Sequence, residues 1–265
     1  MILEFIAVTG SGKTYLCNLL STYLKEAFIL EKILIYTADD LWKEMDKTKS
    51  AVINKFIRVF RRIHCVFSLP VMKLLLNILL SSGRWSEKKQ KIIYYLSIIN
   101  IYRIIRRMVN RNKSGDIAFI LDEGIFHASE IFMDHSAANQ PCELLSAYEK
   151  AVNRIQYIKY NDFKRIYIFV DSTICDNFGR LNNRPEGWPA LMKNLSSEEK
   201  TQALAVFQAK VDQIKSYLSA GSSPCFSLDN TSWTNDFSDS FRKIKGIIHA
   251  ERNLTAASDT RYRNE

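Results

Sequence analysis

The stretch that decides the fold is Ala7-Val8-Thr9-Gly10-Ser11-Gly12-Lys13-Thr14, which joins an apolar run to a helical pattern. Residues 2–9 (ILEFIAVT) are mostly apolar or β-branched, which predicts a buried strand. Leucines and tyrosines then recur at helical spacing through residues 13–27. A glycine-rich turn between a strand and a helix is the setting of the phosphate-binding loop G-x-x-x-x-G-K-[ST]. This sequence matches the pattern except at its first position, where Ala7 replaces glycine.

Each residue type in this loop suits a nucleotide phosphate chain. Gly10 and Gly12, on either side of Ser11, let the backbone turn so that its N–H groups face phosphate oxygens. The helix that starts near Lys13 adds the positive end of its dipole. Lys13 can reach the β- and γ-phosphates, and the Thr14 hydroxyl can ligate Mg²⁺. The loop therefore predicts nucleotide binding.

Short strands alternate with helical segments along the rest of the chain. We expect strands at residues 32–36, 116–122, 165–171 and 225–229, and helices at 142–160, 197–220 and 236–250. Ser196 and Glu199 have the spacing of a capping box at the start of the second of these helices. This alternation predicts an α/β protein with a parallel sheet covered on both faces. In such sheets ligands bind beyond the carboxyl ends of the strands.

A basic, helical insertion separates the second strand from the third. Residues 40–113 show no strand pattern, and their apolar spacing predicts three or four helices. Between Lys43 and Lys113 there are 17 Lys/Arg and 3 Asp/Glu, whereas the whole chain carries a net charge of +9. Such a cluster attracts phosphate-rich partners. It is equally open that these basic residues only form the solvated outer faces of the helices.

Carboxylates follow two of the expected strands. After the third strand, Asp122 would hold Mg²⁺ directly or through water, and Glu123 would accept a proton from an attacking hydroxyl or position a water. The alternative is a solvated strand end before a glycine turn. After the second strand, Asp39 and Asp40 would adjoin an acceptor hydroxyl and compete with Glu123 for the base role. Alternatively, Asp40 is the N-cap of a helix that begins at Leu41.

Two arginines lie on the polar segment 172–192 after the fourth strand. Arg180 and Arg184 are four residues apart, so they can share a helix face and lean over a transferring phosphoryl group. The alternative is two surface arginines paired with Asp176 and Glu186. Elsewhere, the four histidines lack metal-ligand spacing, and we expect aromatic residues of the insertion such as Tyr94 to belong to the core.

These motifs together resemble the thymidylate-kinase-like, nucleoside-monophosphate-kinase-like P-loop kinases. The form Asp122-Glu123-Gly124 with Arg180-Leu181-Asn182-Asn183-Arg184 is most similar to the kinases associated with bacterial surface-polysaccharide synthesis. The resemblance spans residues 2–250. It implies a P-loop NTPase-type three-layer fold, a five-stranded parallel sheet ordered 2-3-1-4-5, Mg-ATP as phosphoryl donor and a mobile arginine lid.

The resemblance leaves the acceptor open. Thymidylate and deoxynucleoside kinases carry an Asp-Arg pair where this chain has Asp122-Glu123, which weakens the case for a thymidine or deoxynucleoside acceptor. We expect an ATP-dependent kinase that acts on a hydroxyl or phosphate of a small molecule or glycan, with an anionic acceptor that includes lipid-linked glycans. The alternatives are a P-loop ATPase and a nucleic-acid-binding protein, including a polynucleotide kinase, that uses the basic insertion.

Length and composition fit one domain in a reducing compartment. The 265 residues are 47% apolar, which suits a single kinase domain over residues 1–252 and a polar, disordered tail at 253–265. The five cysteines are scattered and form no C-x-x-C pair, which favours a cytoplasmic location. No apolar stretch reaches the about 20 residues of a transmembrane helix, so any membrane contact would be peripheral.

Overall fold

A computed structural model describes residues 1–46, 69–81, 83–112, 116–133, 141–155, 163–189, 192–231 and 236–262. Its centre is a parallel sheet of five strands: β1 (Ile2–Ile6), β2 (Leu34–Thr37), β3 (Ile117–Leu121), β4 (Arg165–Asp171) and β5 (Cys225–Asp229). The strand order is β2-β3-β1-β4-β5. The α/β class, the parallel sheet and its order are therefore confirmed.

The central strands are short and buried on both faces. All five residues of β1 and all five of β3 are buried, as expected where helices cover a parallel sheet. Glu4 of β1 stands opposite Leu121 of β3 and Tyr167 of β4 in the register. This register brings the carboxyl ends of the three central strands to one edge of the sheet, where the phosphate loop begins.

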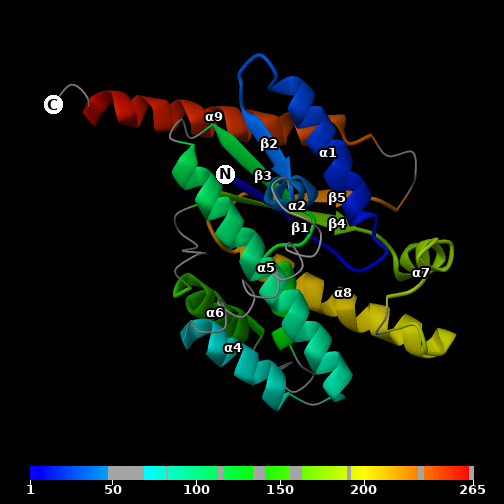
Figure 1. Cartoon of the computed structure of the whole chain (residues 1–265). Coiled ribbons are helices and arrows are strands. Elements are labelled where there is room, and N and C mark those ends of the chain that lie inside the picture. The colour runs from blue at the N-terminus through cyan, green and yellow to red at the C-terminus, as the bar shows by residue number, and fades with distance from the viewer. Residues whose placement is uncertain are drawn as a thin grey trace.

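Helices cover the two faces in separate layers (Figure 1). On one face α1 (Lys13–Ala27) and α9 (Ser238–Tyr262) share a core cluster with the sheet, built around Phe5, Leu20 and Phe241. On the other face lie α5 (Trp85–Arg111), α6 (Pro141–Asn153) and α8 (Ser197–Ser219). The three-layer arrangement that the sequence predicts is confirmed.

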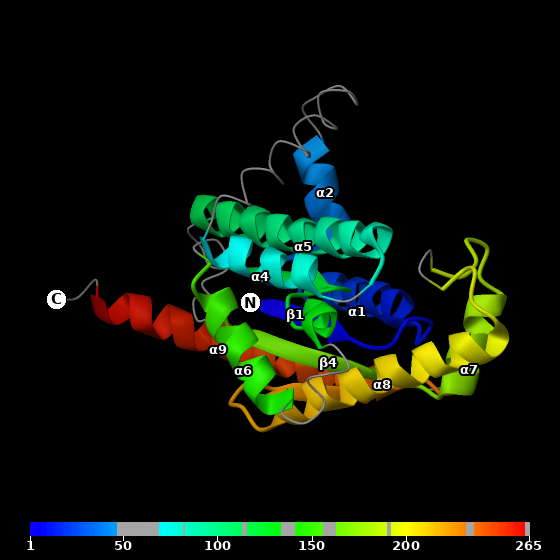
Figure 2. The same cartoon turned by 90° about the horizontal axis from the view of Figure 1, so that it is seen from below.

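The helical region after β2 contains α2 (Ala38–Asp46), α4 (Leu69–Leu80) and α5. Residues 47–68, which include part of the helical pattern seen in the sequence, lie outside the described ranges. Figure 2 shows α4 and α5 running side by side as one layer beyond the sheet. Within the described ranges, none of the helices combines the length and the apolar character that crossing a bilayer requires.

Three elements differ from the sequence expectation. Helix α6 ends at Asn153, whereas we expected it to reach residue 160. Helix α7 (Ile174–Asn182) forms inside the segment expected to be a loop, because Thr173 and Asp176 make a capping box at its start. Helix α9 continues to Tyr262, past the expected end near residue 250, and residues 251–262 contain neither glycine nor proline to stop it.

Candidate functional site

The phosphate loop (residues 7–14) connects β1 to α1 at the carboxyl edge of the sheet. Its two glycines have positive φ angles, +87° at Gly10 and +83° at Gly12. A side chain at either position would also collide with a neighbour: the backbone oxygen of Asn177 at Gly10, and the amide of Asn230 at Gly12. The loop therefore needs glycine at both positions for conformation and for space.

Lys13 is held by two side chains that follow β3. Its ammonium Nζ lies 3.3 Å from Glu123 Oε1 and 3.2 Å from His127 Nε2, and the residue is only 9% exposed. Because an ammonium group can only donate, Nε2 of His127 accepts and its ring proton is on Nδ1. Burial and the Lys13 charge lower the pKa of His127 to about 3, so the imidazole is neutral at neutral pH. The sequence had assigned His127 no role.

Thr14 and Asp122 bring two oxygen atoms together at the mouth of the loop. The Thr14 hydroxyl donates to Asp122 Oδ2 at 3.4 Å. Burial raises the pKa of Asp122, and nearby Lys13 opposes that rise. Such hard oxygens fit Mg²⁺, which is often held by one or two protein oxygens plus phosphates and water. No group of three His, Cys, Asp or Glu side chains in the described part of the chain could hold a metal alone. The residues present therefore fit a magnesium ion that arrives with a nucleotide.

Glu123 is an ionised carboxylate facing the same space. Burial acts to raise its pKa, but the charge of Lys13, the neighbouring His127 and the hydrogen bonds from Lys13 and Tyr94 outweigh burial and lower the pKa. Its side chain is 43% exposed, so an incoming group can reach it. An exposed, ionised carboxylate beside the phosphate loop can accept a hydrogen bond from a hydroxyl.

A buried ion pair supports the turn that carries Glu123 and His127. The Glu4 carboxylate lies 3.5 Å from Arg165 Nη1, and the two side chains are 0% and 1% exposed. Glu4 also accepts from the Tyr102 hydroxyl at 3.1 Å and from the backbone N–H of His127 at 3.3 Å. Burial raises the pKa of Glu4, against the effect of Arg165. The signal in the sequence is one acid inside an otherwise apolar central strand, and our sequence reasoning missed it.

The same buried carboxylate explains why residue 124 is a glycine. A Cβ atom at Gly124 would overlap the side chain of Glu4. The glycine of the Asp122-Glu123-Gly124 motif is therefore required by the close approach of the chain to Glu4.

The insertion contributes residues to the site that the sequence did not single out. On α5, the charge of Glu123 and that of Glu130, after the effect of burial, raise the pKa of Tyr94 well above its usual value. Glu130 lies on the 3₁₀ helix η1 (His127–Phe132), and burial raises its pKa to about 7, opposed by Lys13, Lys210 and Lys91. Lys91 and Tyr94 are three residues apart on one face of α5. Tyr94, Glu130 and Lys91, which we call the polar wall, are thus linked by their electrostatic effects to Glu123 and Lys13.

Asp39 and Asp40 have different surroundings. The backbone N–H of Thr37 donates to Asp40 Oδ2 at 3.0 Å, and that of Asp40 donates to the Thr37 hydroxyl at 3.2 Å. Helix α2 begins at Ala38, so Asp40 is the third residue of a capping box rather than the N-cap we considered. Lys25 also pairs with Asp40 at 2.9 Å. Asp39 is exposed and is one of the charges that, after burial, raise the pKa of Asp122.

Arg180 is bound to the phosphate loop itself. It lies in the last turn of α7, where Nη1 donates to the Ser11 carbonyl at 3.2 Å and Nη2 donates to the Asn230 carbonyl. The Asn230 side chain donates to the same Ser11 carbonyl at 2.6 Å. Asp176, considered as a partner for Arg180, instead caps α7. Arg180 therefore joins α7, the loop and the segment after β5.

Arg184 lies beyond the end of α7 and points into solvent. It pairs with Glu186 at 2.8 Å, and the two side chains are 51% and 69% exposed. The segment has apolar anchors that we did not expect: Trp188 packs edge-on against Phe178 with ring centroids 5.0 Å apart, and its Nε1 donates to Asn182 at 2.8 Å. The segment after α7 is therefore folded back on that helix, with Arg184 at its exposed edge.

Comparison with known proteins gives likeness of fold only. No family model and no curated protein matches the chain. Similar solved structures include deoxyadenosine kinase from M. mycoides with bound dCTP, at 13% identity over 94% of this chain and 100% of that chain, with a TM-score of 0.35. Thymidylate kinase from Ehrlichia chaffeensis is similar at 12% identity over 97% of this chain and 98% of its own, with a TM-score of 0.44. TT1252 from Thermus thermophilus is similar at 15% identity over 98% and 97%, with a TM-score of 0.38.

Proposed function

We propose that this protein is an ATP-dependent phosphotransferase that transfers the γ-phosphoryl group of ATP to a hydroxyl or phosphate of a small-molecule or glycan acceptor. The observation that supports this most directly is the cluster at the phosphate loop. Lys13 lies 3.3 Å from Glu123, and Thr14 lies 3.4 Å from Asp122, so a cation, a carboxylate and a pair of oxygen ligands meet at one point. These are the groups that phosphoryl transfer requires.

In this proposal each residue of the phosphate loop has a separate role. The backbone N–H groups of Gly10 and Gly12 bind the phosphate chain, and Lys13 neutralises charge on the β- and γ-phosphates. The N–H of Ser11 between them donates to the Val8 carbonyl at 3.2 Å and shapes the turn. Thr14 and Asp122 would hold a magnesium ion that offsets the negative charge of the phosphates. These residues position the donor for attack from the side of Glu123.

In this proposal Glu123 and the polar wall contact the acceptor. Glu123 accepts the proton of the acceptor hydroxyl, because its lowered pKa keeps it ionised at neutral pH. Tyr94, Lys91 and Glu130 orient the acceptor against Lys13. Arg180 holds the loop through the Ser11 carbonyl, and Arg184 would close over the phosphates once a ligand is bound.

The basic residues of α5 bear on the alternative of a polynucleotide kinase. Arg103, Arg106 and Arg107 lie in the second half of α5, which ends at Arg111 shortly before the amino end of β3. Figure 1 shows this end of α5 on the opposite side of the molecule from the start of α1. These three arginines therefore do not steer an acceptor toward the phosphate loop, and their charge gives no support to a polynucleotide kinase.

The test is an acceptor panel with product masses. The protein is incubated with Mg-ATP and sugars, lipid-linked glycans, nucleosides or oligonucleotides, and ATP consumption and the mass of each product are measured. We expect the product of one acceptor class to be heavier than the acceptor by about 80 Da, the mass of one transferred phosphoryl group (HPO₃). Glu123→Gln should lower kcat more than it changes ATP affinity, whereas the exposed control Glu198→Gln should change neither. ATP hydrolysis that no acceptor stimulates would instead support an ATPase.

A further inference from the structure

Helix α4 is apolar on its outward side as well as on its inward side. Val71, Leu74, Leu75 and Ile78 are buried and pack into the core. The outer row, which we define as Leu69, Met72, Leu76, Leu79 and Leu80, is 65%, 48%, 52%, 37% and 76% exposed. Their spacing of three and four residues places them along one side of the helix. A contiguous row of five large apolar side chains on a surface indicates an interaction site.

The length of α4 suits a helix that lies on a membrane surface. Its 12 residues rise about 18 Å, well short of the about 30 Å hydrocarbon core of a bilayer. Trp85, at the start of α5, is 67% exposed beside the end of α4. Tryptophan is enriched where a protein meets the boundary between lipid and water. Apolar residues flanked by tryptophan and cations are typical of interfacial helices.

The charge around the outer row is positive. Helix α4 has no acidic residue, and Lys73 on its exposed side, Arg84 and Lys89 are exposed. Lys88 donates to the Leu79 carbonyl at 2.8 Å, which places its ammonium group at the end of α4. Residues 69–81 and 83–112 contain nine Lys/Arg and one acid, Glu87. A cationic border complements an anionic surface.

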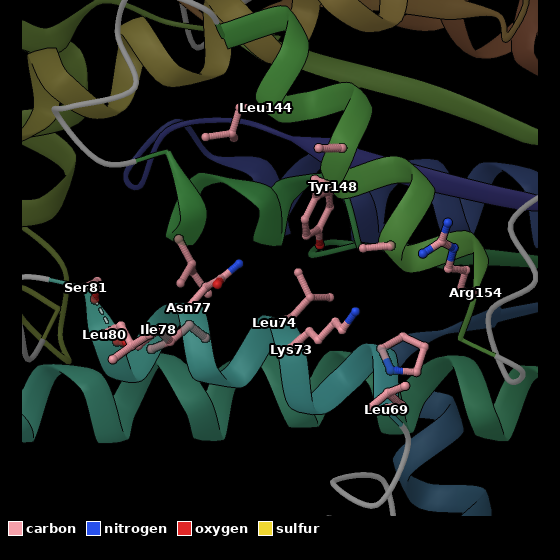
Figure 3. Close-up of a pocket in the computed structure, with 14 residues that line it drawn as sticks. Leu69, Lys73, Leu74, Asn77, Ile78, Leu80, Ser81, Leu144, Tyr148 and Arg154 are labelled. Atoms are coloured by element: carbon pink, nitrogen blue, oxygen red, sulfur yellow. Dashed lines mark hydrogen bonds between the residues drawn. The ribbon is translucent and has the colours of Figure 1, made fainter.

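The apolar surface continues inward beside the row. A groove of about 710 Å³ lies between α4 and α6, with Leu69 and Leu80 on its α4 side and Leu144 opposite. Figure 3 shows Lys73 of α4 and Arg154, just past the end of α6, toward one end of this groove. The groove widens the apolar area next to the outer row and adds another cation, Arg154, to the positive border.

We propose that the outer row and its cationic border dock this protein on the surface of an anionic lipid bilayer, with α4 lying parallel to the membrane plane. A second copy of the chain fits this face less well, because two copies would bring Lys73, Lys88 and Lys89 against their own like charges. The bilayer satisfies both features, since it takes up the apolar side chains and attracts the cations. This inference does not depend on the acceptor or on phosphoryl transfer.

The test is co-sedimentation of the full chain with vesicles. We expect binding to vesicles of phosphatidylcholine with phosphatidylglycerol, weak binding to phosphatidylcholine alone, and a loss of binding as salt is raised. Leu76→Glu should lower the partition coefficient roughly tenfold or more, because it replaces an inserted apolar group by an anion. Lys89→Gln should lower it roughly fivefold. The matched control is Leu30→Glu, at a residue 92% exposed between α1 and β2, and it should not change binding.

Several outcomes would overturn the proposal. They are equal sedimentation with and without vesicles, equal binding to neutral and anionic vesicles, and equal partition of Leu76→Glu and Leu30→Glu. Light scattering on the free protein adds a further criterion: a dimer that Leu76→Glu converts to a monomer would assign the face to a second copy. Circular dichroism melting of each variant ensures that the compared proteins are folded.

Discussion

The two sides of the candidate site differ in how firmly the protein holds them. On the side formed by β1, β3 and η1, Lys13 is bound by Glu123 and His127, and the ion pair of Glu4 and Arg165 beneath them is 0% and 1% exposed. On the side formed by the segment after α7, Arg184 is 51% exposed and pairs with Glu186, which is itself 69% exposed. In the proposed function the first side is preorganised for charge stabilisation, whereas Arg184 on the second side would reach the phosphates only once a ligand is bound.

The largest effect should come from Lys13, the buried cation on the side formed by β1, β3 and η1, which we call the firm side. We expect Lys13→Ala to lower the rate of phosphoryl transfer about 10²–10³-fold, because it removes the cation nearest to the developing charge. Lys243→Ala, an exposed lysine on α9, is the control and should keep the wild-type rate. The measurement is single-turnover transfer from ATP to the acceptor found in the panel. A folded Lys13→Ala protein with a normal rate would contradict the assignment.

The buried ion pair of Glu4 and Arg165 beneath the firm side should affect the free energy of unfolding. We expect Gly124→Ala to lower the free energy of unfolding by about 3 kcal/mol, because the added Cβ would displace the buried Glu4 carboxylate from Arg165. The matched control is Gly179→Ala in α7, where an added Cβ meets nothing within 4 Å. That substitution should raise stability by about 0.5–1 kcal/mol. Urea unfolding measures both, and equal midpoints for the two variants would argue against the role of Glu4.

The sequence predicted the fold, the phosphate loop and the positions of Asp122 and Glu123 better than it predicted the buried residues that support them. A strand, a glycine turn and Lys13 are neighbours in the chain, and parallel strands bring Asp122 to the same edge, so local pattern was sufficient. The contact of Glu4 with Tyr102 and Arg165 joins residues 98 and 161 positions away. No local period encodes such a contact. Tyr94 has the same difficulty, because helical spacing alone cannot separate a core tyrosine from one that faces a site.

Arg180 and Arg184 test most directly the difference between the firm side and the side formed by the segment after α7, which we call the open side. Arg180→Ala should lower both stability and transfer, because Arg180 bonds to the carbonyls of Ser11 and Asn230. Arg184→Ala should leave the unfolding midpoint unchanged and lower kcat about 10–100-fold, because its contact with phosphate would form only with bound ligand. Glu186→Gln, which removes the partner of Arg184, is the control for a purely structural effect. An Arg184→Ala variant that unfolds earlier but transfers normally would reverse the comparison.

The smallest effect concerns the two aspartates at the start of α2. Burial acts to raise the pKa of Asp40, but Lys25 and the hydrogen bonds with Thr37 outweigh it and lower the pKa. A lowered folded-state pKa stabilises the protein above the pKa of the unfolded state, and this stability is lost as pH falls through the folded-state value. Asp40→Asn should therefore cost about 0.5–1 kcal/mol at neutral pH and nothing in strong acid. Unfolding measured at several pH values checks the sign.

Asp39→Asn should show the opposite pattern. Asp39 is exposed and its charge repels that of Asp122, so its loss should leave the unfolding midpoint unchanged. If Asp39 binds the acceptor hydroxyl, its loss should raise the acceptor KM. Asp40→Asn, with its capping box weakened, should leave the acceptor KM unchanged at temperatures where the protein is folded. If Asp39→Asn instead abolishes kcat while Glu123→Gln keeps it, the proton of the acceptor passes to Asp39. The base would then lie at the start of α2, after β2, rather than on the turn after β3 that carries Glu123.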